Sequence, residues 1–146
     1  MKGVQLMKRI GILTCSNATQ DLGCSSVSCL KDLRKRKGEF SRYTEAILIG
    51  IINCPGCPTI TGSEKLLRRI KSLTEFNIDV IHLTYCLIAL CPFKELYLND
   101  LRKTFPNIEF IAGTHEVHLE YSEFRERVSG LFCQTPRNMV DIILNK

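Results

Sequence analysis

The residues of this chain best suited to chemistry are its eight cysteines, two of which stand in the segment Cys54-Pro55-Gly56-Cys57. The segment follows an apolar run over residues 46–52, whose β-branched side chains predict a buried strand. Proline fixes a backbone angle and glycine allows a sharp turn, so the two sulfur atoms can converge on one point. A thiol pair at such a turn is either a redox pair or half of a metal site.

The other cysteines fall where further strands are predicted to end. Apolar, β-branched segments predict strands over residues 8–14, 45–53, 79–85 and 108–112. The candidate ligands Cys15, Cys54, Cys57, Cys86 and His115 come at strand exits, and Cys24, Cys29 and Cys91 lie in the loops beyond. Because the carboxyl ends of parallel strands meet at one edge of a sheet, we expect these eight side chains to share one rim.

Helices are predicted between the strands. One runs over residues 28–37 and stops at Gly38, a second begins at Ser63, and a third starts at Cys91-Pro92. The second has an apolar stripe of Leu66, Leu67, Ile70, Leu73 and Phe76, and the third one of Phe93, Leu96, Leu101 and Phe105. This alternation predicts an α/β fold, a three-layer sandwich of the flavodoxin or Rossmann type with a mainly parallel four-stranded sheet.

We expect a single domain over residues 8–115 with a helical C-terminal extension over residues 116–146. The extension is predicted to form helices over residues 119–131 and 136–144, which pack on the domain or on a second subunit as an oligomer contact. Cys133 lies in this extension and is interpreted as a small buried residue.

Composition narrows the classes of partner. There is no run of about 18 apolar residues and no signal-peptide pattern, so we expect no membrane span and a cytoplasmic protein with reduced thiols. The net charge is +5, but tryptophan is absent and aromatic residues do not cluster among the basic ones, which disfavours nucleic acid as a partner. A basic rim can instead steer a small anionic substrate towards the site.

Sulfur-rich sites favour zinc or an iron–sulfur cluster over other metals, and the scarcity of histidine at the rim favours a cluster. The pairs Cys24/Cys29, Cys54/Cys57 and Cys86/Cys91 match neither a zinc ribbon nor a ferredoxin run. His115 has the position of a ligand or of a general acid or base, whereas His82 is interpreted as a core residue and His118 as a surface residue.

Two interpretations without a metal compete with the metal-centre interpretation. The first is a thiol-disulfide oxidoreductase that uses Cys54 and Cys57 at a helix start, although the pair lacks the aromatic flank of a thioredoxin. The second makes Cys15 a nucleophile above a hydroxyl-rich loop, but Asp21 stands where a cysteine phosphatase has arginine. The second reading is therefore disfavoured.

Several of these segments, taken in order, resemble the CGGC-domain proteins, small cysteine-rich domains named for a Cys-Gly-Gly-Cys centre. The resemblance covers most of residues 8–115. It rests on Cys15, the Cys24 to Cys29 segment with its basic helix, Gly38 and Phe40, the 54–57 turn, the strand ending in Cys86, Cys91-Pro92 and Gly113-Thr114-His115. The family is regarded as metal-binding, with zinc suggested by its cysteine and histidine content, so the resemblance implies a metal ion or cluster as partner.

Pro55 stands where the family has its first central glycine. Proline forbids the positive φ that glycine permits, so the local turn is expected to differ while both thiols remain. The sequence therefore predicts a thiolate-ligated metal centre, with Cys15, Cys54, Cys57 and Cys86 as the favoured ligands. It leaves open which metal is bound, how many centres there are and whether the site is catalytic.

Overall fold

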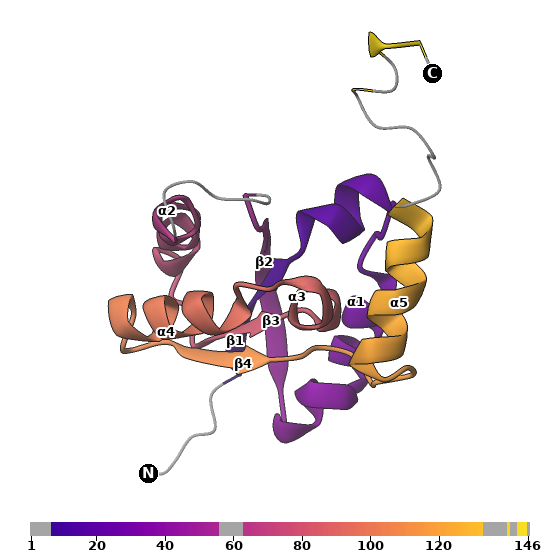
Figure 1. Cartoon of the computed structure of the whole chain (residues 1–146). Coiled ribbons are helices and arrows are strands. Elements are labelled where there is room, and N and C mark those ends of the chain that lie inside the picture. Colours follow the sequence, from indigo (N-terminus) through magenta and orange to yellow (C-terminus); the bar gives the residue numbers. More distant parts are fainter. Residues whose placement is uncertain (1–6, 56–62, 133–139, 141–142, 146) are drawn as a thin grey trace, which may run out of the picture.

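A computed structural model describes residues 7–55, 63–132, 140 and 143–145 and contains a four-stranded parallel sheet (Figure 1). The strands are β1 (Lys8–Thr14), β2 (Ala46–Asn53), β3 (Val80–Leu83) and β4 (Glu109–Ala112), in the spatial order β2-β1-β3-β4. Every neighbouring pair is parallel, and Ile12 is in register with Ile51 on one side and His82 on the other. The predicted parallel α/β fold is confirmed.

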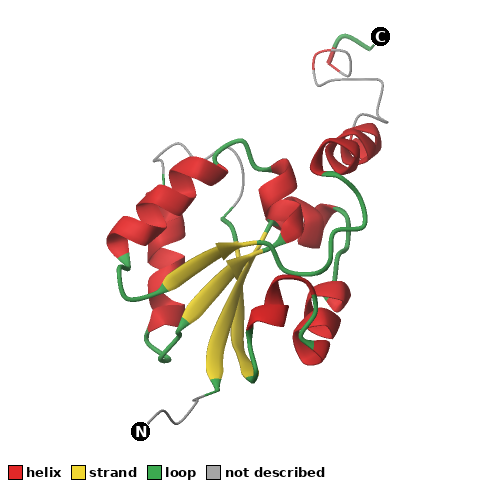
Figure 2. Cartoon of the chain, turned by 90° about the horizontal axis from the view of Figure 1, so that it is seen from below, coloured by secondary structure: helices red, strands yellow, loops and turns green. Residues whose placement is uncertain are grey.

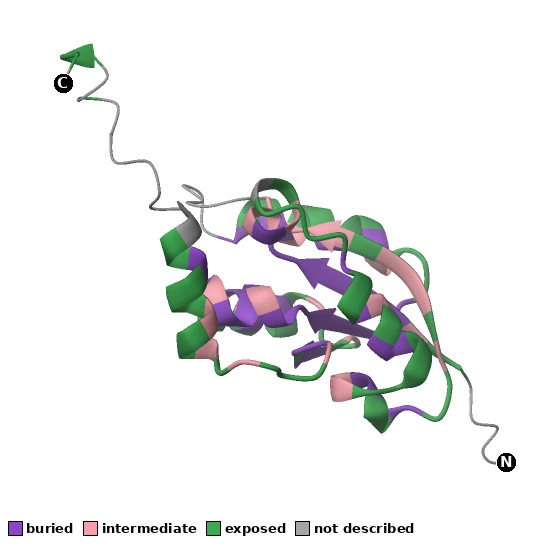
Figure 3. Ribbon diagram, turned by 90° about the vertical axis from the view of Figure 1, so that its right-hand side faces the viewer, coloured by how far each residue is buried: buried purple, intermediate pink, exposed green. Residues whose placement is uncertain are grey.

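Helices cover both faces of the sheet, as Figure 2 shows. They are α1 (Val27–Lys35), α2 (Glu64–Thr74), α3 (Tyr85–Leu90), α4 (Lys94–Thr104) and α5 (Tyr121–Phe132), with a π-helical turn η1 (Asn17–Asp21) and a 3-10 helix η2 (Gly38–Arg42). Ile70 of α2 and Leu101 of α4 are fully buried in the cluster on one face. Leu33 of α1 and Phe40 of η2 belong to the cluster on the opposite face. The buried residues therefore form two layers around the strands (Figure 3).

The strand predicted to be buried over residues 46–52 is an edge strand. None of the residues of β2 is buried, and Ile47 and Ile51 are exposed, because β2 has a neighbouring strand on one side only.

Three further local predictions need correction. The third strand ends at Leu83, and the Thr84 hydroxyl accepts a hydrogen bond from the Leu87 N–H as the N-cap of α3, so Cys86 lies in the first turn of a helix. The expected loop over residues 16–27 contains η1. The apolar stripes were partly misplaced, because Phe76 and Leu96 are exposed whereas Tyr97 and Leu98 are buried.

The main element described in the C-terminal extension is α5, which packs against α3. The Tyr85 ring lies 5.1 Å from the Tyr121 ring and 5.0 Å from the Phe124 ring, measured between centroids, and its hydroxyl donates to the Leu119 carbonyl. Most of the expected 136–144 helix, and Cys133, lie outside the described residues. None of the described helices combines the length and apolar character that crossing a membrane requires.

Candidate functional site

The main feature at the carboxyl edge of the sheet is a cavity of about 610 Å³. The segments η1, α1, α3 and α5 and the loop after β4 form its walls. Four of the predicted ligands, Cys24, Cys29, Cys86 and His115, line it, together with His118. The cavity is thus lined by three thiols and two imidazoles from three separate stretches of the sequence.

A second group of cysteines surrounds a much smaller void of about 20 Å³ beside the first. Cys15, Cys54 and Cys91 line this void, and each is buried. The Cys54 N–H donates to the Thr14 carbonyl across 2.8 Å, which fixes the end of β2 against the end of β1. The two groups meet where the Cys15 backbone N–H is hydrogen-bonded to the Cys86 sulfur.

The single rim expected from the sequence is therefore divided into two thiol groups. Of the favoured ligands, Cys15 and Cys54 lie at the small void and Cys86 at the large cavity, while Cys57 lies outside the described residues. Thiol and imidazole are ligands that zinc and iron–sulfur clusters accept, so the residue types fit a soft metal. Within the described ranges, however, no three cysteine, histidine or acidic side chains are close enough to hold an ion as they stand.

Cys29 is the thiol most closely fixed by its surroundings. It is buried, and its sulfur lies 3.2 Å from the Thr114 hydroxyl oxygen. Burial raises the pKa of Cys29 to about 11, an effect that its hydrogen bond with Thr114 only partly offsets. This thiol consequently keeps its proton at neutral pH unless a cation replaces it.

Cys86 is half-buried in the first turn of α3, with its sulfur 3.0 Å from the Thr84 hydroxyl oxygen. Burial raises the pKa of Cys86 as well, against the hydrogen bonds from Thr84 and the Cys15 backbone. Reactive cysteines have lowered pKa values, so Cys86 lacks the property of an activated nucleophile.

The loop that carries His115 is held from several sides. The Glu39 N–H donates to the Thr114 carbonyl across 2.9 Å, and the Glu116 N–H donates to the buried Asp32 carboxylate across 2.8 Å. Gly38 has a φ of +58°, and a Cβ added there would lie 2.6 Å from the Thr114 carbonyl oxygen. Only glycine allows this close approach, so η2 and the His115 loop are packed backbone to backbone.

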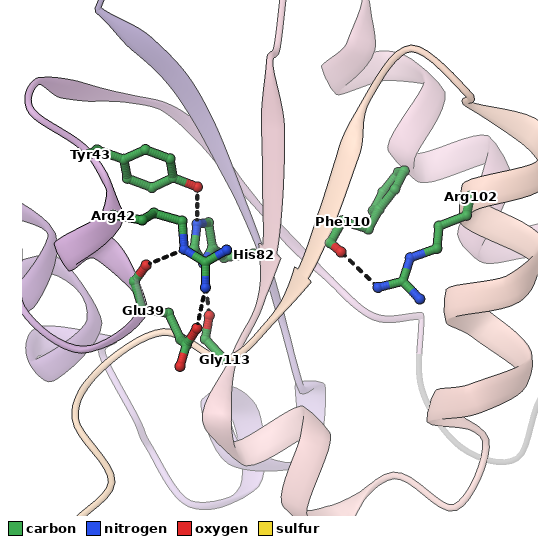
Figure 4. Close-up of polar contacts among 7 residues, drawn as sticks. All are labelled: Glu39, Arg42, Tyr43, His82, Arg102, Phe110 and Gly113. Atoms are coloured by element: carbon green, nitrogen blue, oxygen red, sulfur yellow. Dashed lines mark hydrogen bonds and ion pairs between the residues drawn. The ribbon is translucent and has the colours of Figure 1, made fainter.

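A buried histidine supports the start of the same loop (Figure 4). The Nδ1–H of His82 donates to the Gly113 carbonyl across 2.8 Å, and Nε2 therefore accepts from the Tyr43 hydroxyl at 2.7 Å. Burial lowers the pKa of His82 to about 4, which keeps the ring neutral. The interpretation of His82 as a core residue is confirmed, since it is 0% exposed.

His115 is oriented by its own backbone neighbour. Its Nδ1 lies 2.8 Å from the Glu116 carbonyl oxygen, which can only accept, so Nδ1 carries the proton and Nε2 the lone pair. Backbone contacts of this kind commonly orient metal-binding histidines. The His118 ring is stacked on that of His115, with 6.1 Å between centroids and 15° between planes.

Sequence reasoning missed two contributors to this site. His118 is exposed, as expected of a surface residue, but it also lines the cavity. Thr114 accepts from the Tyr85 N–H at 3.2 Å and contacts Cys29, linking α1, α3 and the loop after β4. The short spacing from His115 to His118 was a signal for the first. Thr114 belongs to the Gly113-Thr114-His115 motif of the resemblance, but nothing in the sequence assigned it a role in the site.

Comparison with known proteins adds two findings. The model of the CGGC domain matches residues 9–115. The protein MJ0582 of Methanocaldococcus jannaschii, which bears the description uncharacterized, is 29% identical over 116 residues, covering 73% of this chain and 86% of its own length. No solved structure matches the chain.

Proposed function

The chain belongs to the CGGC domain family, and from this premise we propose that it is a metal-binding protein whose ligands line the large cavity. The proposed ligands are the thiolates of Cys24, Cys29 and Cys86 and Nε2 of His115. One observation carries the proposal, namely that four soft or borderline donors from separate segments line a single cavity. Three sulfur atoms and one nitrogen atom make a tetrahedral set of the kind that zinc accepts.

The proposed ligands must move closer together when the ion binds, because the described donors are not within bonding reach of one point. Cys24 is the exposed thiol of the set, although its sulfur accepts a hydrogen bond from the Ser26 N–H at 3.4 Å, which would have to break for the sulfur to move. Cys29 and Cys86 are less exposed and contact Thr114 and Thr84, so we expect smaller shifts of these two sulfur atoms.

Metal binding would also change the protonation of the site. Burial raises the pKa of Cys29 and of Cys86, so a bound cation has to displace protons from both sulfur atoms. A bound zinc ion would supply Lewis-acid or structural chemistry at this position. The protein's own residues would hold the ion, and Thr84 and Thr114 would orient two of the sulfur atoms.

The alternative of a redox pair formed by Cys54 and Cys57 gains no support from the geometry. Cys57 lies outside the described residues, and α2 begins at Glu64, directly after the Ser63 that the sequence predicted as its start. Cys54 itself is buried and only 5% exposed, which limits access by a disulfide substrate. We therefore place the function in the larger cavity.

The test is metal analysis of protein purified without oxygen, followed by zinc titration of the metal-free form. We expect about one zinc per chain, released protons, and loss of at least tenfold in affinity for both Cys29→Ser and Cys86→Ser. Cys91→Ser is the matched control, since it removes a buried thiol at the small void. Loss of zinc in Cys91→Ser with retention in Cys29→Ser would show that the ligand set is wrong.

A further inference from the structure

The cavity is far larger than a metal ion requires. Its volume of about 610 Å³ would hold on the order of 20 water molecules at the volume each has in the liquid. Binding sites for small organic molecules commonly have about 300–1,000 Å³. The volume beyond the thiols is therefore the size of an organic ligand.

The walls of this space are mainly apolar. Its apolar lining residues are Ala18, Leu22, Val27, Leu119, Phe124 and Val128. Tyr85 adds an aromatic ring, which lies 5.2 Å from the His115 ring and 5.0 Å from the Phe124 ring. Water finds few hydrogen-bond partners at such walls. A ligand with an aromatic or branched aliphatic body would instead bury apolar surface there.

The charged groups at the cavity favour one sign of ligand charge. Among the described residues that line it, none is aspartate or glutamate, and Arg127 is the one lysine or arginine. Arg127 is exposed and contacts Glu123 across 2.8 Å, so its positive charge lies at the mouth and is partly balanced. The imidazoles of His115 and His118, on the loop after β4, are further hydrogen-bonding groups that line the cavity.

We propose that the cavity binds a small organic anion with an apolar, preferably aromatic, body beside the thiols. The body lies between η1 and α5, against Val128 and Phe124, and the anionic head lies towards Arg127 and the two histidines. This inference concerns the same cavity as the proposed metal site, but it requires no metal. The two can therefore fail separately.

Two dyes that differ by one group provide the probes. They are 8-anilinonaphthalene-1-sulfonate and its uncharged parent N-phenyl-1-naphthylamine, each titrated by fluorescence into the natively folded, metal-free protein. We expect saturable binding of one anionic dye per chain, weaker binding of the uncharged dye, and a two- to fivefold loss for the anionic dye alone in Arg127→Gln, about the range of one exposed charge. Equal affinity for both dyes, or an equal loss of both in Arg127→Gln, would overturn the anionic part of the proposal.

The location is tested by filling the cavity. Val128→Trp places a large side chain in the wall and should weaken dye binding at least about tenfold. Val117→Trp is the matched control, because Val117 is exposed and does not line the cavity. Equal dye binding in the two variants would overturn the proposal.

A measurement on the unaltered chain keeps the proposal testable if Val128→Trp does not fold. Cys24 is exposed on the cavity wall, so saturating dye should slow its alkylation by iodoacetamide, as followed by peptide mass spectrometry. An unchanged rate would place the dye elsewhere and overturn the inference. The double variant Cys29→Ser/Cys86→Ser separates the two proposals, because it should lose zinc and still bind the dye.

Discussion

At the scale of single residues, the site depends on neutral groups buried beside it. His82 joins Tyr43 on η2's flank to Gly113, which is followed directly by Thr114 and the proposed ligand His115. Cys29 and Thr114 form the next contact towards the cavity. The proposed ligands His115 and Cys29 are thus supported by residues such as His82 and Tyr43, which do not line the cavity.

The burial of His82 predicts how the stability of the fold depends on pH. The pKa of His82 is about 4 in the folded chain and about 6.5 when unfolded, so between these values only the unfolded chain takes up the proton. We therefore expect the free energy of unfolding to fall by on the order of 2 kcal/mol through this group between pH 7 and pH 5. This contribution to stability is complete above the pKa of the unfolded chain, about 6.5, and is lost as the pH falls towards the pKa of the folded chain, about 4.

Urea unfolding of the wild type, His82→Gln and Tyr43→Phe at both pH values checks this prediction. His82→Gln should lose this part of the pH dependence. Tyr43→Phe should keep it, because burial is the main cause of the lowered pKa and the ring remains buried. If His82→Gln keeps the wild-type pH dependence, the proposed role of His82 is wrong.

Residue chemistry was also where the sequence was least informative. The cysteines, His115 and the core position of His82 were identified from the sequence, since strand ends follow from apolar patterning. The division of the cysteines into two groups was not predicted. The spacing of residues along the chain does not determine on which face of the sheet each loop lies after its strand ends. Cys86 was placed at a strand end because the N-cap role of Thr84 was overlooked.

At the scale of elements, the contact between η2 and the His115 loop leaves no room for a side chain at Gly38. Gly38 combines a positive φ with backbone atoms closer than 3 Å to a would-be Cβ, whereas Gly23 has a positive φ in open surroundings. We expect Gly38→Ala to lower the free energy of unfolding by roughly 1–3 kcal/mol more than Gly23→Ala. Both variants bear the strain of a positive φ, so the difference between their free energies of unfolding reports the steric clash at position 38.

Chemical denaturation of both variants measures this difference. Zinc titration of Gly38→Ala adds a functional readout, because displacement of Thr114 should weaken the site through Cys29. Equal stability of the two variants would mean that the loop carrying His115 can move away from position 38 with no loss of free energy, which would contradict the close packing of η2 on this loop.

The sequence located most elements, and the physical reason is the clear patterning of their apolar residues. Strand β2 and helix α2 were found because β-branched runs and a repeat of Leu66, Ile70 and Leu73 are unambiguous. Helix α4 was found with a shifted face, since it begins at Lys94 and buries Tyr97 and Leu98 rather than Phe93 and Leu96. An amphipathic face depends on the packing partner as much as on the repeat.

At the scale of the whole molecule, the proposed metal should be linked to folding. A ligand that binds only the folded chain stabilises it in proportion to the logarithm of its concentration relative to Kd. At 100 times Kd, zinc should add about 2.7 kcal/mol to the free energy of unfolding, and a chelator should remove it. Cys91→Ser should retain this gain and Cys86→Ser should lose it.

Thermal melts of the wild type, Cys91→Ser and Cys86→Ser, each with and without zinc, provide the measurement. A rise in Tm that is equal in the wild type and Cys86→Ser would contradict binding at the cavity. The comparison uses identical zinc concentrations because Tm depends on the free ligand.

The composition of the cavity wall has a further consequence for how such proteins diverge. The thiols lie within residues 9–115, which the family model matches, whereas Leu119, Phe124, Arg127 and Val128 lie beyond that range. The proposed thiol ligands and the α5 part of the cavity wall therefore come from separate stretches of the chain. If the proposed site is correct, exchanging α5 between relatives should change which organic ligand is bound while leaving the thiol ligands in place.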